Sequence, residues 1–291
     1  MAKYINPYTD FGFKKLFGEE ANKDLLLDFL NTLLPKKHQI KTLSFNNPEL
    51  LGATESDRRA IFDVYCEAKS GEKFIVEMQK AEQEFFKDRS VYYAAYPIRS
   101  QGLKGKWNFE LKAVYFIGIL DFVYDKNVPN PVLIREVSLK DQHGEEFYEK
   151  LQMIYIQMPV FNKMESELTT RQDKWLYFLK NLPSLEHIPA ILKEKVFRKA
   201  FQTAEVASMT EQDRLYYEQN LLDYWTYMAT MDTAEQKGYD RGIKEGIEQG
   251  IDIGETQKAV DIARNLKKEG LDPILIAKTT GLSLDEIARL D

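Results

Sequence analysis

The chain has 291 residues, of which 44% are hydrophobic and 30% charged, as in an ordinary soluble globular protein. Its three histidines and single cysteine are too few and too widely separated for a local zinc site, which argues against zinc hydrolases, zinc fingers and histidine-pair nucleases. A net charge of −6 also argues against a partner that is attracted by a strongly basic overall charge.

The beginning of the sequence has no basic segment followed by an apolar run, so we expect no signal peptide. The longest uncharged apolar stretch, residues 113–120, is far shorter than the ~20 residues of a membrane helix. A single cysteine allows no intrachain disulfide, which fits a reducing compartment. We therefore expect a cytoplasmic protein without a membrane partner.

The hydrophobic pattern predicts alternating helices and strands over about residues 1–160. A helix over 11–34 follows Asp10 as its N-cap, and a second helix over 82–103 contains Pro97. Predicted strands cover 39–45, 59–67, 73–80, 111–123, 132–139 and 153–158. From Arg171 the pattern is helical. We expect an α/β core over 1–160, a helical extension over 161–235, and a helical tail over 236–291.

The most informative segment is the predicted hairpin formed by strands 59–67 and 73–80. A three-residue loop over 69–71 with Gly71 in the left-handed conformation would pair Phe62 with Met78, Val64 with Val76, and Cys66 with Phe74. One face is then wholly apolar, whereas a two-residue loop would mix polar and apolar residues on both faces. The buried pattern therefore favours the three-residue loop.

This register places two acidic side chains, Asp63 and Glu77, directly opposite each other. Opposed carboxylates repel unless a charge neutralises them, and Mg²⁺ or Mn²⁺ prefers such hard oxygen ligands. A divalent ion held there could activate water and stabilise the charge on a cleaved phosphodiester. The alternative is a solvated hairpin face with no function.

At these residues the sequence resembles the PD-(D/E)xK nucleases, and more narrowly the Rpn-type recombination-promoting nucleases, a PD-(D/E)xK transposase family. The resemblance rests on the stretches 9–18, 62–65, 76–79 and 89–93, on Gln101, and on the glycine-rich tail. It implies an α/β fold with a restriction-endonuclease-like core, a mixed sheet flanked by helices, followed by a helical C-terminal region. It also implies DNA as the partner and Mg²⁺ as the cofactor, with Mn²⁺ or Ca²⁺ as alternatives.

The family's roles transfer to three residues of this chain. Asp63 and Glu77 match the metal-binding acids, and Gln79 matches the position that usually holds the catalytic lysine. Phe62 replaces the motif proline, and Gln79 can orient water but cannot supply a positive charge. Lys14 and Lys80 are the candidate replacements for that charge.

Further candidates surround this motif. Asp10 is either a third acid of the site or a simple N-cap, and the N-cap reading is favoured. Candidate phosphate contacts, whose alternative is ordinary solvated charge, are Lys14, Arg58, Arg59, Lys80 and Arg89.

The tail contains five glycines at intervals of four residues, from Gly238 to Gly254, with Ile243, Ile247 and Ile251 beside them. Glycine costs ~1 kcal/mol relative to alanine in a helix, so a strict repeat favours close approach of another backbone over a flexible linker. We expect a homo-oligomer formed through this helix. The last residues have helix-turn-helix spacing, but the acidic first turn of the final helix favours a packing module over a DNA reader.

Together these observations predict a metal-dependent DNA endonuclease that acts on recombining or mobile DNA. The alternative is a nuclease fold with little catalysis, which acts as a DNA-binding or protein-assembly factor.

Overall fold

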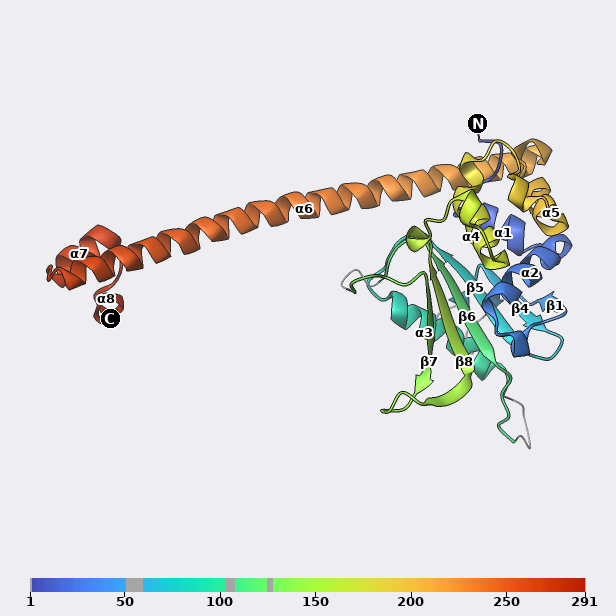
Figure 1. Ribbon diagram of the computed structural model, residues 1–291, viewed down its shortest axis with the longest axis horizontal. Coiled ribbons are helices and arrows are strands. Elements are labelled where there is room, and N and C mark those ends of the chain that lie inside the picture. The colour runs from blue at the N-terminus through green and yellow to red at the C-terminus, as the bar shows by residue number, and fades with distance from the viewer. Residues whose placement is uncertain (1, 51–59, 103–107, 125–127, 291) are drawn as a thin grey trace. The chain divides into compact units, whose positions relative to one another are not determined.

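The computed structural model describes residues 2–50, 60–102, 108–124 and 128–290, and it divides into two compact units, Met1–Tyr224 and Trp225–Asp291 (Figure 1). The helices are α1 (Asp10–Phe17), α2 (Lys23–Leu33), α3 (Phe86–Arg99), α4 (Arg171–Asn181), α5 (Lys195–Ala204), α6 (Glu211–Lys268), α7 (Pro273–Thr280) and α8 (Leu284–Ala288). The strands are β1 (Leu43–Phe45), β2 (Glu49–Leu50), β3 (Ala60–Ile61), β4 (Val64–Ala68), β5 (Lys73–Gln79), β6 (Val114–Leu120), β7 (Ile134–Lys140) and β8 (Glu146–Gln157).

The first unit is built on a six-stranded mixed sheet in the order β1-β4-β5-β6-β8-β7. The central strands β5, β6 and β8 are parallel, while β1, β4 and β7 pair antiparallel with their neighbours. Strands β2 and β3 form a separate small ribbon. Helix α3 packs against the sheet through Phe86 and Ala94, which join a core cluster with Phe116 and Tyr155. The mixed sheet with flanking helices confirms the predicted fold class.

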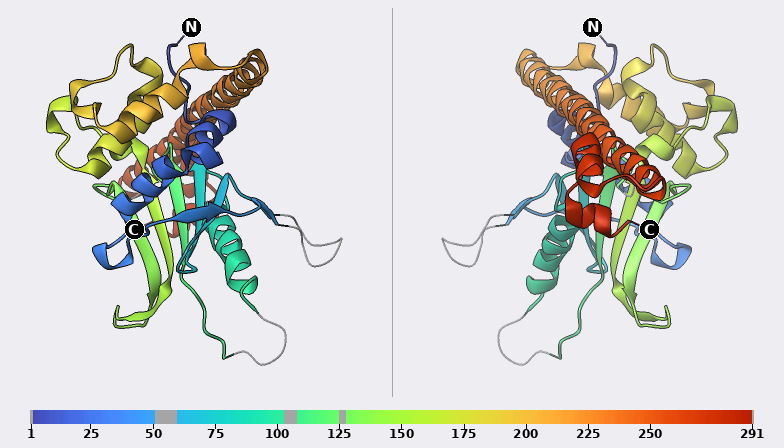
Figure 2. Two further views of the ribbon diagram at one scale, coloured as in Figure 1. Left: turned by 90° about the vertical axis from the view of Figure 1, so that its right-hand side faces the viewer. Right: turned by 90° about the vertical axis from the view of Figure 1, so that its left-hand side faces the viewer.

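A second layer of helices surrounds Trp175, which is fully buried. Its ring contacts Phe17, Phe29 and Phe197, at centroid distances of 5.7, 6.0 and 4.8 Å. These residues come from α1, α2, α4 and α5, which gather at one end of the sheet, away from α3 (Figures 1 and 2). The aromatic cluster therefore joins elements that are far apart in the sequence.

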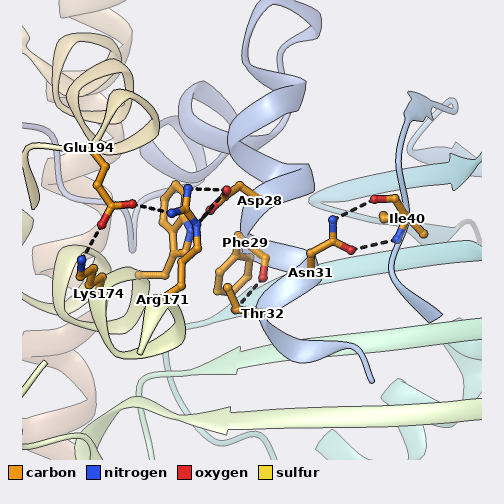
Figure 3. Close-up of polar contacts among 9 residues, drawn as sticks. Asp28, Phe29, Asn31, Thr32, Ile40, Arg171, Lys174 and Glu194 are labelled. Atoms are coloured by element: carbon orange, nitrogen blue, oxygen red, sulfur yellow. Dashed lines mark hydrogen bonds and ion pairs between the residues drawn. The ribbon is translucent and has the colours of Figure 1, made fainter. Parts of the chain in front are cut away.

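Polar contacts reinforce this layer (Figure 3). Asp28 on α2 accepts hydrogen bonds from the indole of Trp175 at 2.7 Å and from the guanidinium of Arg171 at 2.7 and 2.9 Å. Arg171 and Lys174 also pair with Glu194, which precedes α5. Because the Arg171 contact to Asp28 involves two carboxylate oxygens, it orients α4 relative to α2.

The predicted helix over 11–34 is wrong as a single element. The structure ends α1 at Phe17 and begins α2 at Lys23, and a short 3-10 helix, Glu20–Asn22, lies between them. The predicted N-cap is also wrong. Thr9 is the N-cap, and its hydroxyl accepts the amide of Gly12 at 3.0 Å.

Other boundaries also differ from the predictions. Strand β1 begins at Leu43 rather than at residue 39, since the side chain of Asn31 holds both backbone groups of Ile40 at 2.8–2.9 Å. Helix α3 begins at Phe86 rather than at residue 82. Strand β8 begins at Glu146 rather than at residue 153, because its polar first half pairs with β7 at an exposed end of the sheet. Exposed pairing of this kind leaves no apolar run in the sequence.

The second unit has a much smaller core, formed by Ala263, Ile276 and Ile287 from α6, α7 and α8. Asp272 caps α7, and Ser283 forms a capping box with Glu286 at the start of α8. Gly281 lies between these helices with a φ of 76°, a conformation that favours glycine. None of the helices in the described part of the chain is long and apolar enough to cross a membrane.

Candidate active site

The hairpin β4–β5 lies in the middle of the sheet and has the predicted register. Val64 pairs with Val76 and Cys66 with Phe74, and Gly71 has a φ of 99° in the connecting loop. The three-residue loop is therefore confirmed. Strand β5 pairs on its other side with β6 in parallel, so the acidic end of the hairpin lies at the carboxyl end of two parallel strands.

The predicted strand over 59–67 is interrupted just before this end. The chain bends at Asp63, and Phe62 donates its amide to the carbonyl of Pro48 at 3.0 Å. The predicted common face of Phe62, Val64 and Cys66 is wrong for Phe62, whose ring packs 5.6 Å from Tyr65 and 5.2 Å from Tyr93. At this point the amide of Asp63 donates to the side chain of Glu77 and not to a backbone carbonyl of β5. The backbone can therefore turn out of the regular strand.

The carboxylates of Asp63 and Glu77 are each held by a backbone amide at the end of the hairpin. The amide of Asp63 donates to Glu77 Oε1 at 3.2 Å, and the amide of Met78 donates to Asp63 Oδ2 at 2.7 Å. Gln79 donates from Nε2 to Glu77 Oε2 at 3.0 Å. The structure therefore brings Asp63, Glu77 and Gln79 together, with the two carboxylates fixed by backbone and amide donors.

The electrostatic environment of this pair is unfavourable for two negative charges. Glu77 is 1% exposed and Asp63 is half-buried. Burial, together with the charge of Asp63, raises the pKa of Glu77, and burial followed by the charge of Asp10 raises the pKa of Asp63. Arg89 on α3 compensates only in part, with Nη2 3.8 Å from Glu77 Oε2. A divalent cation would remove the repulsion that remains.

The start of α1 also lies near the pair. Lys14 forms an ion pair of 2.8 Å with Asp10, and its charge lowers the pKa of Asp63, opposing the effect of burial. Lys80 is directed elsewhere, because its ammonium lies 5.6 Å from the ring centroid of Tyr224. Two of the candidate phosphate contacts, Arg58 and Arg59, lie outside the described residues.

Sequence reasoning missed a second acidic position beside the hairpin. Asp121 follows β6, and its amide donates to the carbonyl of Gln79 at 2.9 Å. Tyr224 on α6 donates its hydroxyl to Asp121 Oδ2 at 3.4 Å, and burial raises the pKa of Asp121 to about 6. The available signal was its position as the first charged residue after the apolar run 113–120.

The donor set of the acidic pair fits a hard divalent ion. Mg²⁺ usually takes one or two carboxylates and completes its octahedron with water and phosphate oxygens, so Asp63 and Glu77 suffice as protein ligands. Each carboxylate oxygen that accepts one hydrogen bond retains a second lone pair. Within the described ranges there is no cluster of three or more His, Cys, Asp and Glu side chains that could hold a metal. The fit therefore rests on two acids.

Comparison with known proteins extends this description. Residues 7–234 match the family model described as "PD-(D/E)XK nuclease family transposase". Residues 256–291 match "Rpn/YhgA-like nuclease family, C-terminal HTH domain". Neither a curated protein nor a solved structure matches significantly. The two family matches support a nuclease-like, DNA-associated role. Since the first match covers most of the sequence, the chain belongs to the PD-(D/E)XK nuclease family transposases.

Proposed function

We propose that this protein is a metal-dependent DNA endonuclease of the cytoplasm that hydrolyses phosphodiester bonds in recombining or mobile DNA. The observation that carries the proposal is the acidic pair. The side chains of Asp63 and Glu77 are linked through backbone amides, Glu77 is buried and Asp63 half-buried, Arg89 neutralises them only in part, and the resemblance assigns both to the family's acids. Two close carboxylates in such surroundings are neutralised either by a proton or by a bound cation, and the family match favours the cation.

In this proposal Asp63 and Glu77 hold the metal, with Mg²⁺ favoured and Mn²⁺ or Ca²⁺ as alternatives. The bound ion supplies an activated water and stabilises the charge on the leaving oxygen. Gln79 fixes the orientation of Glu77 through its Nε2 hydrogen bond, which leaves the side-chain carbonyl oxygen of Gln79 to accept a hydrogen bond from the attacking water and so to orient it.

The positive charge missing at Gln79 is supplied by two other residues of this chain. Arg89 approaches Glu77 from α3, and Lys14 approaches Asp63 from α1. Lys80 is less suitable, because successive side chains of a strand point to opposite faces and its ammonium lies over Tyr224. We therefore assign Lys14 and Arg89 to phosphate binding at the reacting bond, and Lys80 to a contact further along the strand.

The direct test is plasmid cleavage by the purified full chain with Mg²⁺, Mn²⁺ or Ca²⁺. We expect Asp63→Ala and Glu77→Ala to abolish cleavage, while Glu110→Ala, which removes an exposed acid before β6, has no effect. Circular dichroism checks that each variant is folded. Cleavage that survives both substitutions would exclude this site.

A second candidate function is DNA binding or protein assembly with little catalysis. It is favoured by Gln79, which supplies no titrating amine, and by the helix-turn-helix match over 256–291. If the purified protein binds DNA but does not cleave it at any metal concentration, this alternative is supported.

The long helix α6 supports a further proposal, a homo-oligomer formed through the glycine repeat over 238–254. A Cβ atom added at any of its five glycines would meet nothing within 4 Å, and Ile243, Ile247 and Ile251 are exposed beside them. Glycine rows of this kind allow two helix backbones to approach closely. Deletion of 238–254 should lower the number of copies in the assembly, measured from the mass of the protein in solution. An unchanged number of copies would contradict the proposal.

A further inference from the structure

A groove of about 820 Å³ runs along the first half of α3. Two of its three aromatic side chains are exposed, with exposed fractions of 65% for Phe85 and 44% for Tyr92. Such rings cost free energy in water. The groove is therefore suited to a flat, aromatic ligand.

The groove is continuous with the candidate active site through one residue. Arg89 lines the groove and stacks over the ring of Tyr93 with its guanidinium carbon 5.0 Å from the centroid. The same guanidinium lies 3.8 Å from Glu77. A ligand seated on Phe85 and Tyr92 would therefore reach the acidic pair across Arg89.

The charges of the groove specify the ligand further. Glu84 and Asp88 line it beside the aromatic rings. These carboxylates repel phosphate groups, but carboxylates accept hydrogen bonds from the exocyclic amines of nucleobases. Arg89, at the end nearest Glu77, attracts phosphate. This arrangement of charges would place a base beside Phe85, Tyr92, Glu84 and Asp88. The sugar-phosphate backbone of the ligand would then lie toward Arg89 and the acidic pair.

We propose that this groove binds an unpaired, amino-bearing base of the DNA substrate, that is cytosine, adenine or guanine in a single-stranded segment. A base inside a duplex is stacked on both faces and cannot reach a ring. Base–aromatic stacking contributes ~1–3 kcal/mol per base. The inference rests on the proposed nuclease function and names its substrate class.

The test measures binding rather than cleavage, in EDTA, with fluorescently labelled single-stranded and double-stranded oligonucleotides of the same sequence. We expect Phe85→Ala and Tyr92→Ala each to weaken single-strand binding about 5- to 150-fold and to leave duplex binding unchanged. Tyr92→Phe keeps the ring and should bind as the parent protein does. Phe147→Ala, which removes an exposed ring on β8, is the matched control.

Base preference is tested by competition with oligonucleotides of deoxycytidine, deoxyadenosine and thymidine. The parent protein should prefer the first two, and the double variant E84Q/D88N should lose this preference. Equal loss of single-strand and duplex binding, or unchanged binding in both alanine variants, overturns the proposal.

These results are independent of the nuclease test. If plasmid cleavage fails while Tyr92→Ala still weakens single-strand binding, the proposed nuclease function is wrong and the proposed role of the groove is supported. If cleavage depends on Glu77 but the Phe85→Ala and Tyr92→Ala variants bind single strands normally, only the proposed role of the groove is wrong.

Discussion

The two units of this protein place their apolar residues in opposite ways. The first unit buries many aromatic side chains and, next to them, the acid Glu77, which repels the half-buried Asp63. The second unit has three residues at the centre of its core and leaves Ile243, Ile247 and Ile251 of α6 exposed. The first unit is therefore stabilised by its own packing and can support a strained site, whereas the glycine helix of the second offers an uncovered surface to a partner.

The largest expected effect concerns the core of the first unit. Trp175→Ala removes the ring around which α1, α2, α4 and α5 pack, together with the hydrogen bond to Asp28, and should cost ~3–5 kcal/mol of unfolding free energy. Chemical denaturation measures this loss. Phe147→Ala, whose ring is 79% exposed, is the control and should have a negligible effect. A loss below that range would show that the aromatic layer is not central.

The core of the second unit should unfold independently of the first unit. Ile287→Ala removes one of its three central residues and should cost ~2–3 kcal/mol, a large share of what so small a core provides. We expect hydrogen exchange to accelerate in α7 and α8 while the first unit keeps its denaturation midpoint. Leu284→Ala, at an exposed neighbouring position, is the control. A lower midpoint in the first unit would mean that the two units are coupled.

The acidic pair should make the stability of the first unit dependent on pH. The pKa of both Asp63 and Glu77 is raised in the folded state, so the folded protein binds more protons than the unfolded chain at pH values above the ordinary carboxyl range. Stability without metal should then fall as pH rises through this window. Added Mg²⁺ should restore stability most strongly at the higher pH, because it competes with protons.

Asp63→Asn tests the same repulsion directly. An asparagine oxygen can still accept the amide of Met78, but the charge beside Glu77 is lost. We expect the thermal midpoint in EDTA at neutral pH to rise by ~2–4 °C, equivalent to ~1 kcal/mol. The variant should also show a smaller pH dependence and no Mg²⁺ stabilisation. A variant with the parent's pH dependence would show that the pair is not the source.

The contrast between buried and exposed residues also explains what the sequence could predict. Alternating apolar residues and Gly71 determine the hairpin register, because a two-residue loop would place Val64 opposite Glu77 and mix polar and apolar side chains on one face. The bend at Asp63 was not predictable, since it depends on hydrogen bonds between carboxylates and backbone amides. Asp121 was missed because its partner Tyr224 is 103 residues away in the sequence. The groove on α3 likewise depends on which aromatic residues the sheet leaves uncovered.

The smallest expected effects lie in the glycine repeat, and they separate two interpretations of the exposed helix. Gly242→Ala and Gly246→Ala each remove a helix penalty of ~0.5–1 kcal/mol at positions where a methyl group meets nothing within 4 Å. Helicity should therefore increase in both variants. If two copies contact each other through the glycine row, the same methyl groups hold the backbones apart, and we expect the oligomer to dissociate at higher protein concentration than the parent.

Measurement of circular dichroism together with solution mass distinguishes these effects within one variant. Gln249→Ala, which lies outside the glycine row, is the matched control and should raise helicity slightly without changing the mass. Increased helicity with an unchanged oligomer would show that the glycines face solvent in the assembled protein. The self-association proposal would then have to rest on the exposed isoleucines alone, because the glycines could no longer account for close approach of the two backbones.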